Sequence, residues 1–435
     1  PVNDGWIRIY RSVDGGRTWA HWTSFITGTE SRHPSLTCAE RASGENWVFL
    51  AYEATLSDST KSITVIRFDP EAIAIWDVAY PASGITGTTD IYPRLCTDNR
   101  VYDLYYVYLT YAVNAIDYYP VMFARSTDFG QTFSTPQNIT GGSQNSSFVP
   151  RPDIAYGTAG LFVAFEKPGW TGSAWETQVW VTQSTNFGMA WNSPIQLTAT
   201  NLGAWHPSVA VAVDVSSVMV AFTRAYSSET DINGCHSLDG GVTYSLPTSL
   251  PWTYDNEKSV ALAVSDSGGR YLAAYWRSYD IEYTSTDAAS PGTWTTETVV
   301  NEENWASSNH SRPAICVDPI RPTDQQACIA WTDYRGPYYD IYFDVDIPAL
   351  TSSDPAGDTT LSKAAKNIVR LTFSQPITLP GAGAALVIKP LAGGGDLGSQ
   401  FSYTLSPDGL TLIATENATA MNNRTWYRFT PAAGL

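Results

Sequence analysis

Four copies of one eight-residue pattern constrain the fold of this chain more than any other feature of its sequence. Each copy places serine first, aspartate or asparagine third, glycine fifth and an aromatic residue last. The pattern residues are Ser12, Asp14, Gly16 and Trp19; Ser126, Asp128, Gly130 and Phe133; Ser184, Asn186, Gly188 and Trp191; and Ser237, Asp239, Gly241 and Tyr244. Such self-similarity marks a repeat architecture, in which each repeat is one supersecondary unit.

The chemistry of the pattern predicts a tight turn that is followed by a strand. Aspartate and serine side chains bond to nearby backbone N–H groups, and glycine adopts turn conformations that other residues resist. The aromatic residue that ends the pattern then opens a strand and packs its ring into a sheet. A fifth, degenerate copy runs from Ser285 to Trp294 and carries an insertion.

A second marker recurs with the same period and opens a short apolar strand each time. It is usually a polar or aromatic residue followed by proline, and its copies begin at His33, Tyr92, Arg151, His206, Glu257 and Arg312. A second apolar strand follows each copy. Four strands in roughly 50 residues, repeated six times, are typical of a β-propeller. We therefore predict an all-β fold of radially arranged four-stranded sheets.

The two ends of the repeat region leave the number of blades open. The N-terminal segment, Trp6 to Phe25, contains only the third and fourth strands of a blade, and the last unit lacks the serine–aspartate pattern. We predict a six-bladed propeller in which the N-terminal hairpin completes the last blade. A seven-bladed propeller with one shortened blade is the alternative.

The four patterns resemble the Asp-box, or BNR, repeats of the sialidase-like β-propellers. The segment from Ala330 to Arg335 is also similar to that superfamily. The resemblance covers residues 1–348, which we assign to the propeller. Because the box is a structural element in that family, the resemblance implies a fold and says little about chemistry.

The character of the chain changes after the propeller segment. Residues 349–363 are rich in serine, threonine and aspartate and are expected to form a linker. Residues 364–435 contain five expected strands and resemble the bacterial Ig-like modules of S-layer and other secreted proteins. Since such a β-sandwich needs about seven strands, we expect this one to be incomplete. It is expected to be either a fragment of a longer protein or a domain that takes up a strand from elsewhere.

Charged residues gather at the expected mouth of the propeller channel, where the first strands begin. Arg32, Arg151 and Arg312 lie there, and guanidinium groups match the geometry of a carboxylate. The sialidase resemblance implies an arginine clamp, with Glu166 and Tyr334 as candidates for a nucleophile pair. The Phe/Tyr-Arg-Ile-Pro signature of that family is absent. We therefore favour the alternative that these arginines pair with carboxylates at the mouth.

The charge of the chain excludes several kinds of partner. With 25 basic and 42 acidic residues, the formal net charge is −17, which repels a phosphate backbone, so we expect no nucleic-acid partner. No apolar run reaches the roughly 18 residues of a transmembrane segment. Scarce lysine and abundant serine, threonine and asparagine favour a secreted or cell-surface protein. Five Asn-x-Ser/Thr triplets leave glycosylation open.

The five cysteines show no zinc-type spacing, and we expect neither a metal nor a cofactor. Cys316 and Cys328 bracket a predicted hairpin and would face each other across it. A disulfide between them is one alternative, and two buried thiols are the other. A structural calcium ion near Asp344 and Asp346 remains a weaker alternative.

Together these features predict an extracellular or cell-surface β-propeller protein without a catalytic site. Its expected role is to bind glycans or surface proteins, or to assemble into a filament or surface layer. Strand exchange through the Ig-like unit would support self-association. The alternative function is that of a secreted exo-sialidase or another glycoside hydrolase, in which the three arginines would converge beside a tyrosine–glutamate pair.

Overall fold

The computed structural model divides the chain into two compact units, Pro1–Val345 and Asp346–Leu435. The described residues contain β-strands and one short 3-10 helix, η2 (Gly398–Gln400), but no α-helix, which confirms the all-β prediction. In this part of the chain, no helix is long and hydrophobic enough to cross a bilayer. The structure describes residues 5–12, 18–40, 46–70, 74–81, 89–98, 106–114, 119–141, 150–170, 175–198, 203–213, 215–226, 229–250, 255–265, 269–301, 313–317, 327–333, 340–345, 350–354, 368–373, 386–390, 397–407, 411–416 and 427–431.

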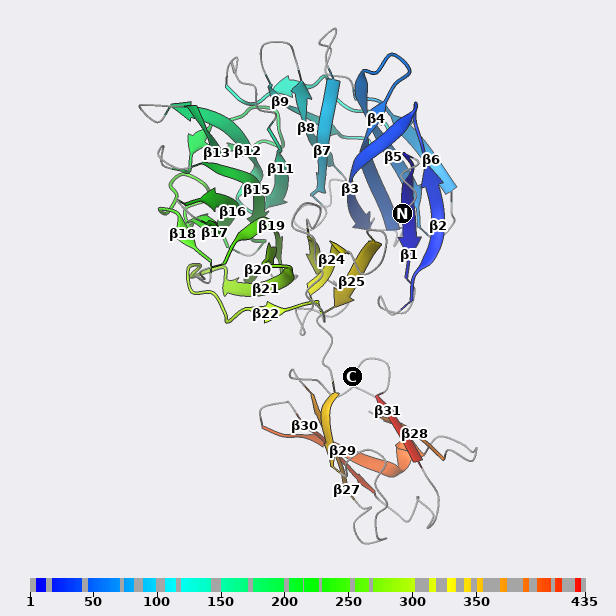
Figure 1. Cartoon of the computed structure of the whole chain (residues 1–435). Helices are drawn as coiled ribbons and strands as arrows, with labels where there is room; N and C mark the ends of the chain where they lie inside the picture. The colour runs from blue at the N-terminus through cyan, green and yellow to red at the C-terminus, as the bar shows by residue number, and fades with distance from the viewer. Residues whose placement is uncertain are drawn as a thin grey trace. The chain divides into compact units, whose positions relative to one another are not determined.

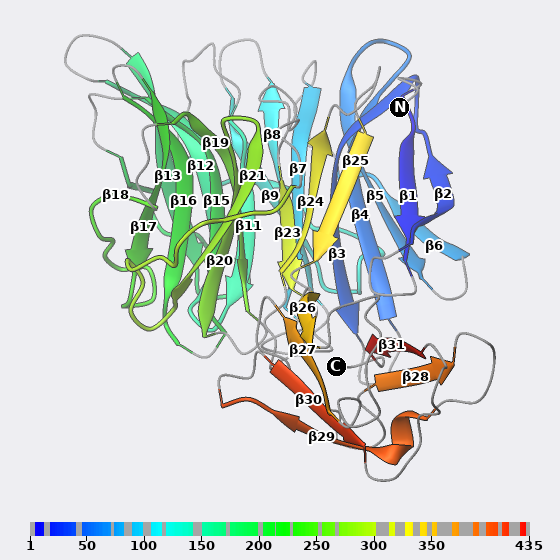
Figure 2. The ribbon, with the colours of Figure 1, turned by 60° about the horizontal axis from the view of Figure 1, so that its bottom comes forward.

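Six antiparallel sheets repeat along the first unit, each built from strands that follow one another in the chain. Figure 1 shows these sheets arranged radially, as in a β-propeller, and Figure 2 shows their strands lengthwise. The sheets, numbered here as blades 1 to 6, consist of β3 (Glu30–Glu40), β4 (Asn46–Thr55), β5 (Lys61–Asp69) and β6 (Ala74–Ala79); β7 (Thr89–Thr97), β8 (Val107–Asn114), β9 (Val121–Ser126) and β10 (Gln137–Asn138); β11 (Asp153–Gly157), β12 (Gly160–Trp170), β13 (Trp175–Ser184) and β14 (Ile195–Gln196); β15 (Ala204–Val211), β16 (Val218–Ala225), β17 (Thr230–Ser237) and β18 (Thr248–Ser249); β19 (Glu257–Val264), β20 (Arg270–Arg277), β21 (Asp280–Asp287) and β22 (Thr298–Val299); and β23 (Ala314–Val317), β24 (Ala327–Asp333) and β25 (Asp340–Val345).

The N-terminal strands β1 (Ile7–Arg11) and β2 (Ala20–Phe25) form a two-stranded sheet of their own. Phe25 packs into a buried cluster with Phe68 of blade 1. Trp19, at the other side of the hairpin, meets Phe343 of blade 6 with ring centroids 4.8 Å apart. The Ser31 amide of blade 1 donates to the Gly5 carbonyl at 2.7 Å, and the Arg11 guanidinium donates to the Pro70 carbonyl at 2.6 Å. Among the described residues, however, neither β1 nor β2 pairs as a strand with blade 1 or blade 6. Closure by this hairpin, and the choice between six and seven blades, therefore stays a prediction.

The blades pack face to face, so their middle strands are buried on both sides. In β8 all residues from Val107 to Val113 are buried, which requires a continuous apolar run instead of an alternating one. Aromatic rings fill much of the space between sheets: Phe49 and Tyr111 lie between blades 1 and 2, and Phe162 and Phe222 between blades 3 and 4. This packing accounts for the abundance of aromatic residues in the sequence.

The serine–aspartate patterns form a hydrogen-bonded turn after the third strand of a blade. In blade 2 the amide of Gly130 donates to Ser126 Oγ at 2.7 Å. The amide and hydroxyl of Thr132 donate to the two carboxylate oxygens of Asp128 at 2.9 and 2.5 Å. The turn therefore has the bonds that the sequence predicts.

The same turn recurs in the next two blades with small changes. In blade 3 the amide oxygen of Asn186 replaces a carboxylate and accepts from the Ala190 amide at 2.9 Å. In blade 4 both groups of Thr243 donate to Asp239, as in blade 2. The closing aromatics pack into the core of the preceding blade; these are Phe133, Trp191 and Tyr244. Asp14 and Gly16 of the first copy lie outside the described residues.

Each turn is also fixed against the blade before it. Gly188 has a φ of 78°, and a Cβ atom there would lie 2.2 Å from the ring of Phe123 in blade 2. A polar side chain near the end of the third strand of the earlier blade donates to a backbone carbonyl of the turn. The pairs are Arg67 with Phe129, Arg125 with Phe187 and Gln183 with Gly240, at 3.0, 2.9 and 2.7 Å.

Side chains of the first strands connect neighbouring blades near the centre. Ser35 Oγ accepts from the amide of Leu95 at 3.0 Å, and Ser208 Oγ accepts from the amide of Leu262 at 3.0 Å. Asp153 accepts from the Ser208 hydroxyl at 2.8 Å. The residue that follows the proline of the second marker therefore joins one blade to the next.

The described part of the second unit contains two sheets, and their strands include all five that the sequence predicts. The strands are β26 (Leu350–Asp354), β27 (Ile368–Phe373), β30 (Thr411–Glu416) and β29 (Phe401–Leu405) in one sheet and β28 (Leu386–Pro390) and β31 (Tyr427–Pro431) in the other. The linker prediction is wrong at its beginning, because residues 350–354 pair with β27. An Ig-like sandwich remains a prediction for this unit.

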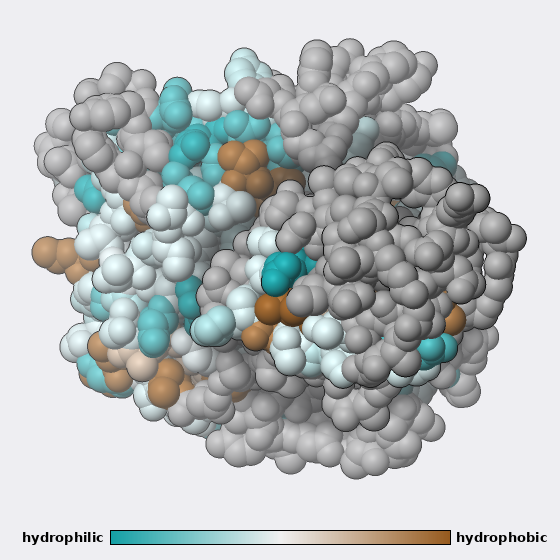
Figure 3. Space-filling model, turned by 90° about the horizontal axis from the view of Figure 1, so that it is seen from below, coloured by the Kyte–Doolittle hydropathy of each residue, from teal (hydrophilic) through white to brown (hydrophobic). Residues whose placement is uncertain are grey.

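The described surface carries its hydrophobic side chains in separate places. In Figure 3 the brown hydrophobic residues of the described part of the chain form several small patches among polar ones. Scattered exposed hydrophobic residues are normal for a folded protein, whereas a large patch would indicate an interface. A group of exposed aromatic residues is therefore a stronger sign of a binding surface than a single exposed residue.

Candidate functional site

The first strands begin with a repeated irregularity of the backbone. In blades 1, 2, 4 and 5, two residues of the first strand lie opposite one residue of the second. The first residue of each bulge has a positive φ, between 51° and 60°, and these residues are His33, Tyr92, His206 and Ser259. Positive φ is uncommon for residues other than glycine. In three of these blades proline follows, which further restricts the backbone. Strain of this kind often marks functional sites.

The side chains at these bulges contact one another from blade to blade. The rings of His33 and Tyr92 have centroids 4.6 Å apart. The Arg151 guanidinium, at the same place in blade 3, lies 5.2 Å from the centroid of the Tyr92 ring and donates to His206 Nε2. We call these four residues the mouth cluster, since they lie near the beginning of, or just before, the first strands of four successive blades. Figure 1 shows these first strands, β3, β7, β11 and β15, on the inner side of the ring of sheets.

A buried glutamate holds the first member of the mouth cluster. The Glu53 side chain is only 1% exposed, and its carboxylate accepts from His33 Nδ1 at 2.9 Å and from the Lys61 ammonium. Burial alone would raise the pKa of Glu53, but the bonds from His33 and Lys61 outweigh it and hold the pKa below its usual value. Glu53 is therefore an anchored carboxylate at the base of the cluster.

Glu166 occupies the corresponding place in blade 3. It is 3% exposed, and its two oxygens accept from the backbone amides of Arg151 at 3.0 Å and His206 at 2.6 Å. One carboxylate thus fixes the backbone of two mouth-cluster residues in different blades. This arrangement favours a positioning role for Glu166 over the catalytic role that the sialidase resemblance implies.

The arginines of the expected clamp have different surroundings. Arg32 is half exposed and pairs with Glu30 at 2.5 Å, whereas Arg151 belongs to the mouth cluster. Arg312 and Tyr334 lie outside the described residues. Pairing with carboxylates at the mouth, the alternative that the sequence favours, is seen for Arg32 and also for Arg94, which lies 3.8 Å from Asp153.

A second charged cluster lies at the same end of blade 5. Arg277 contacts Glu282 at 2.8 Å, Glu297, and Asp255 at 3.9 Å. Burial raises the pKa of Glu282 to about 7; Arg277 opposes this rise, and the nearby carboxylates add to it. Since Glu282 is 1% exposed, it can exchange a proton near neutral pH but has little surface to offer a ligand.

Sequence reasoning missed most of this second cluster. Of its four members, only Arg277, which ends the second strand of the blade, is expected near the mouth from its place in the repeat. The sequence does contain a signal for this cluster, which is the short hairpin after Arg277. The next strand, β21, begins after only two residues and has acidic side chains at its first and third positions, Asp280 and Glu282. Antiparallel pairing of such a hairpin brings these groups beside the arginine.

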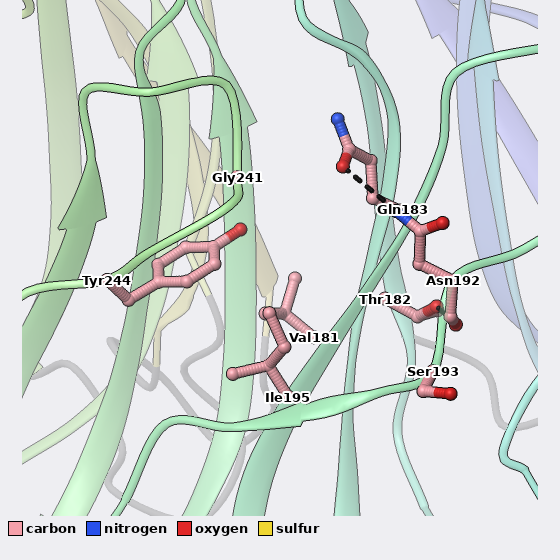
Figure 4. A pocket seen from close by; sticks show the side chains of 8 residues that line it. All are labelled: Val181, Thr182, Gln183, Asn192, Ser193, Ile195, Gly241 and Tyr244. Carbon is pink, nitrogen blue, oxygen red and sulfur yellow. Dashed lines mark hydrogen bonds between the residues drawn. The ribbon is translucent and has the colours of Figure 1, made fainter.

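A cavity at the opposite end of the blades is too small for a glycan. Figure 4 shows it between the outer strands of blade 3 and the turn of blade 4, with Tyr244, Gln183 and Asn192 among the residues around it. Its volume is about 20 Å³, which accommodates a single water molecule. The cavity therefore belongs to the packing of the turn.

Cys316 and Cys328 are direct partners in the pairing of β23 with β24. The sequence places them on opposite strands of a hairpin, and the register now places them face to face. Opposed Cα atoms of an antiparallel pair lie within the distance range that a disulfide requires. Cys316 is exposed and Cys328 is only partly buried, so the alternative of two buried thiols is wrong. The disulfide itself stays a prediction, which thiol counting with and without reductant would check.

The described residues contain no group of three or more histidine, cysteine, aspartate or glutamate side chains placed to hold a metal ion. Asp346, one of the two candidate calcium ligands, lies outside these residues. The calcium alternative therefore stays untested.

The chain is similar to solved structures of other proteins, but only at low sequence identity. No family model and no curated protein sequence matches the chain. Among solved structures, it is similar to an alpha-L-arabinanase from Penicillium chrysogenum, at 10% identity and a TM-score of 0.48 over 72% of this chain and 92% of the other. It is also similar to the intramolecular trans-sialidase of Ruminococcus gnavus, at 11% identity and a TM-score of 0.48 over 73% and 94%. At such identities no residue role is transferred from either protein.

Proposed function

We propose that this chain is an extracellular or cell-surface glycan-binding protein, and that the mouth cluster is its binding surface. The observation that carries the proposal is the contact of His33, Tyr92, Arg151 and His206, at one equivalent position of four successive blades. Tyrosine and histidine rings stack on the apolar faces of sugars, and imidazole and guanidinium groups donate to hydroxyl or carboxyl oxygens.

The buried carboxylates support binding rather than hydrolysis. A glycosidase of the usual type needs two carboxyl groups that reach the scissile bond. Glu53 and Glu166 are almost fully buried, and their oxygens accept from His33, Lys61 and two backbone amides. Their geometry suits the positioning of the cluster.

The experiment is a glycan-binding screen with the full chain and the variant Tyr92→Ala. Tyr92 contacts both His33 and Arg151, so its removal is expected to abolish binding without loss of the fold. Leu246→Ala is the matched control, because Leu246 is 84% exposed and lies beside the turn at the opposite end of blade 4. Equal binding by the Tyr92 variant would exclude the mouth cluster as the binding surface.

The second candidate function, exo-sialidase activity, is favoured by one observation. The Arg151 guanidinium lies over Tyr92 at the mouth, where a carboxylate of a sugar would find a cation. Turnover of a fluorogenic sialoside by the parent chain, lost in Arg151→Ala, would establish it. We expect no turnover by either protein.

Self-association remains a separate proposal. In the described part of the second unit, β26 and β29 are the outer strands of the larger sheet, and an outer strand can pair with another chain. Light scattering over a range of concentrations would show oligomers if strand exchange occurs, and a monomer at every concentration would exclude it.

A further inference from the structure

Two tryptophans form an exposed pair at the end of blade 3. Trp170 and Trp175 are direct partners in the pairing of β12 with β13, and their ring centroids are 5.6 Å apart. Their exposed fractions are 52% and 68%, unusually high for such large apolar rings. The other end of this hairpin, at Ser184, carries the serine–asparagine turn, so the pair lies at the same end of the blade as the mouth cluster.

The β12–β13 hairpin is longer than its counterparts at this end. Beyond Glu166, β12 continues for four residues, whereas β4 continues for two beyond the corresponding Glu53 and β16 for two beyond Thr223. At about 3.3 Å per residue, the two additional residues project the tryptophan pair roughly 7 Å farther than the other strands reach.

Further side chains connect this pair to the mouth cluster. Glu176 follows Trp175, and a Cβ atom on Gly203 would lie 3.6 Å from the Glu176 carboxylate and 3.1 Å from the ring of Trp205. Trp205 directly precedes His206 of the mouth cluster. Aromatic and carboxylate groups therefore extend from the mouth across blades 3 and 4 to the hairpin end; we call Trp170, Trp175, Glu176 and Trp205 the aromatic ridge.

We infer that the aromatic ridge binds a chain of neutral pyranose sugars whose end lies at the mouth cluster. This inference rests on the proposed function and adds the class of ligand, an oligosaccharide of several uncharged units. Tryptophan faces stack on the apolar faces of pyranose rings, and the Glu176 carboxylate accepts from sugar hydroxyls. The negative charge of Glu176 and the net charge of −17 disfavour polyanionic glycans and anionic membranes along the ridge.

The experiment measures affinity of the full chain for cello-, manno- and chito-oligosaccharides, from the monosaccharide to the hexasaccharide, by titration calorimetry. For the parent chain we expect affinity to rise with length in at least one series. Trp175→Ala is expected to lower the affinity for long members by about tenfold, the loss of one stacking contact, and to leave that for the shortest binding member unchanged. Tyr92→Ala is expected to remove both.

The matched control is Trp19→Ala, which removes another exposed tryptophan, directly before β2. Near-ultraviolet circular dichroism of each variant checks that the fold is kept. An affinity that does not rise with length, or a Trp175 variant that binds long oligosaccharides like the parent, would overturn the ridge and leave the mouth cluster intact. Absence of any binding by the parent would overturn both proposals.

Sedimentation with vesicles of phosphatidylcholine, alone and with phosphatidylserine, separates a sugar site from a membrane anchor. We expect the chain to stay in the supernatant with both vesicles. Co-sedimentation that is lost in the Trp170→Ala, Trp175→Ala double variant would assign the pair to a membrane and overturn the sugar site.

Discussion

The two ends of the blades differ in how they use the repeat. At the end that carries the turns, three blades repeat the same bonds between the same residue types, Ser126 with Gly130, Ser184 with Gly188 and Ser237 with Gly241. At the mouth, one equivalent position holds histidine, tyrosine, arginine, histidine and serine in five successive blades. The end with repeated residues therefore stabilises the fold, whereas the end with varied residues can differ in its chemistry from blade to blade.

Local strain follows the same division. The turns place positive φ mostly on glycine, where it costs little, although Phe129 and Phe187 also adopt it. The mouth places it on His33, Tyr92 and His206, which have a Cβ atom and precede proline. The mouth therefore carries strain that the surrounding sheet and the buried glutamates must offset.

The largest expected effect comes from the repeated end. Gly188→Ala places a Cβ atom 2.2 Å from the Phe123 ring at a positive φ, and we expect it to destabilise the propeller by about 3–5 kcal/mol. Gly240→Ala is the matched control, because φ is also positive there and the nearest atom is 3.8 Å away; its expected cost is about 1 kcal/mol. Thermal denaturation compares them, and equal losses would show that the ring contact is unimportant.

A buried carboxylate at the mouth should give the next largest effect. Glu53→Gln removes the carboxylate charge that pairs with His33 and Lys61. We expect the free energy of unfolding to fall by about 1–3 kcal/mol at pH 7. Because the folded pKa of Glu53 lies below its unfolded value, its contribution is present above about pH 4.5 and is lost as the pH falls through the folded pKa. Parent and variant should therefore converge in acid, and a constant gap down to pH 2 would contradict the pKa assignment.

For the charged cluster of blade 5 we expect the opposite effect of pH on stability. The pKa of Glu282 rises to about 7 in the folded chain, so ionisation of this group destabilises the fold as the pH rises from about 4.5 to 7. Glu282→Gln should be more stable than the parent at pH 8, by roughly 1–3 kcal/mol, and close to it at pH 5. Melting temperatures at the two pH values measure the difference, and a variant that is less stable at pH 8 would disprove the assignment.

The smallest effect tests whether the turns are interchangeable. Asp128→Asn gives blade 2 the residue that blade 3 has at Asn186, whose amide oxygen already accepts the Ala190 amide. We expect a change in stability within about 0.5 kcal/mol. Asp128→Ala removes the acceptor for both groups of Thr132 and should cost more, about 1–2 kcal/mol. Equal losses in the two variants would show that the carboxylate charge is essential.

The sequence predicts the repeated part of the molecule well for a physical reason. A serine, a carboxylate or amide, and a glycine at fixed spacing form bonds within one turn, so local chemistry determines the structure. The inner-strand marker is predicted less well, because its bulge depends on how the first strand pairs with the second. In blade 5 the sequence aligns Glu257 with His33, whereas the positive φ places Ser259 there.

The candidate site is harder to predict because its contacts cross blades. Tyr92 meets His33 and Arg151 from blades on either side, and nothing in the spacing of these residues reveals which rings touch. Glu166 shows the same limit, because its carboxylate accepts from a backbone amide of a neighbouring blade. The expected arginine clamp follows a family pattern, but the described arginines take different partners.

In the three hydrogen bonds described above between a third strand and the turn of the next blade, the donor always lies in the earlier blade. Arg67, Arg125 and Gln183 lie in the earlier blade, and the carbonyls that they hold lie in the later one. Because the earlier blade leaves the ribosome first, its donor can be in place before the next turn forms. We therefore expect the blades to add in chain order from the N-terminus.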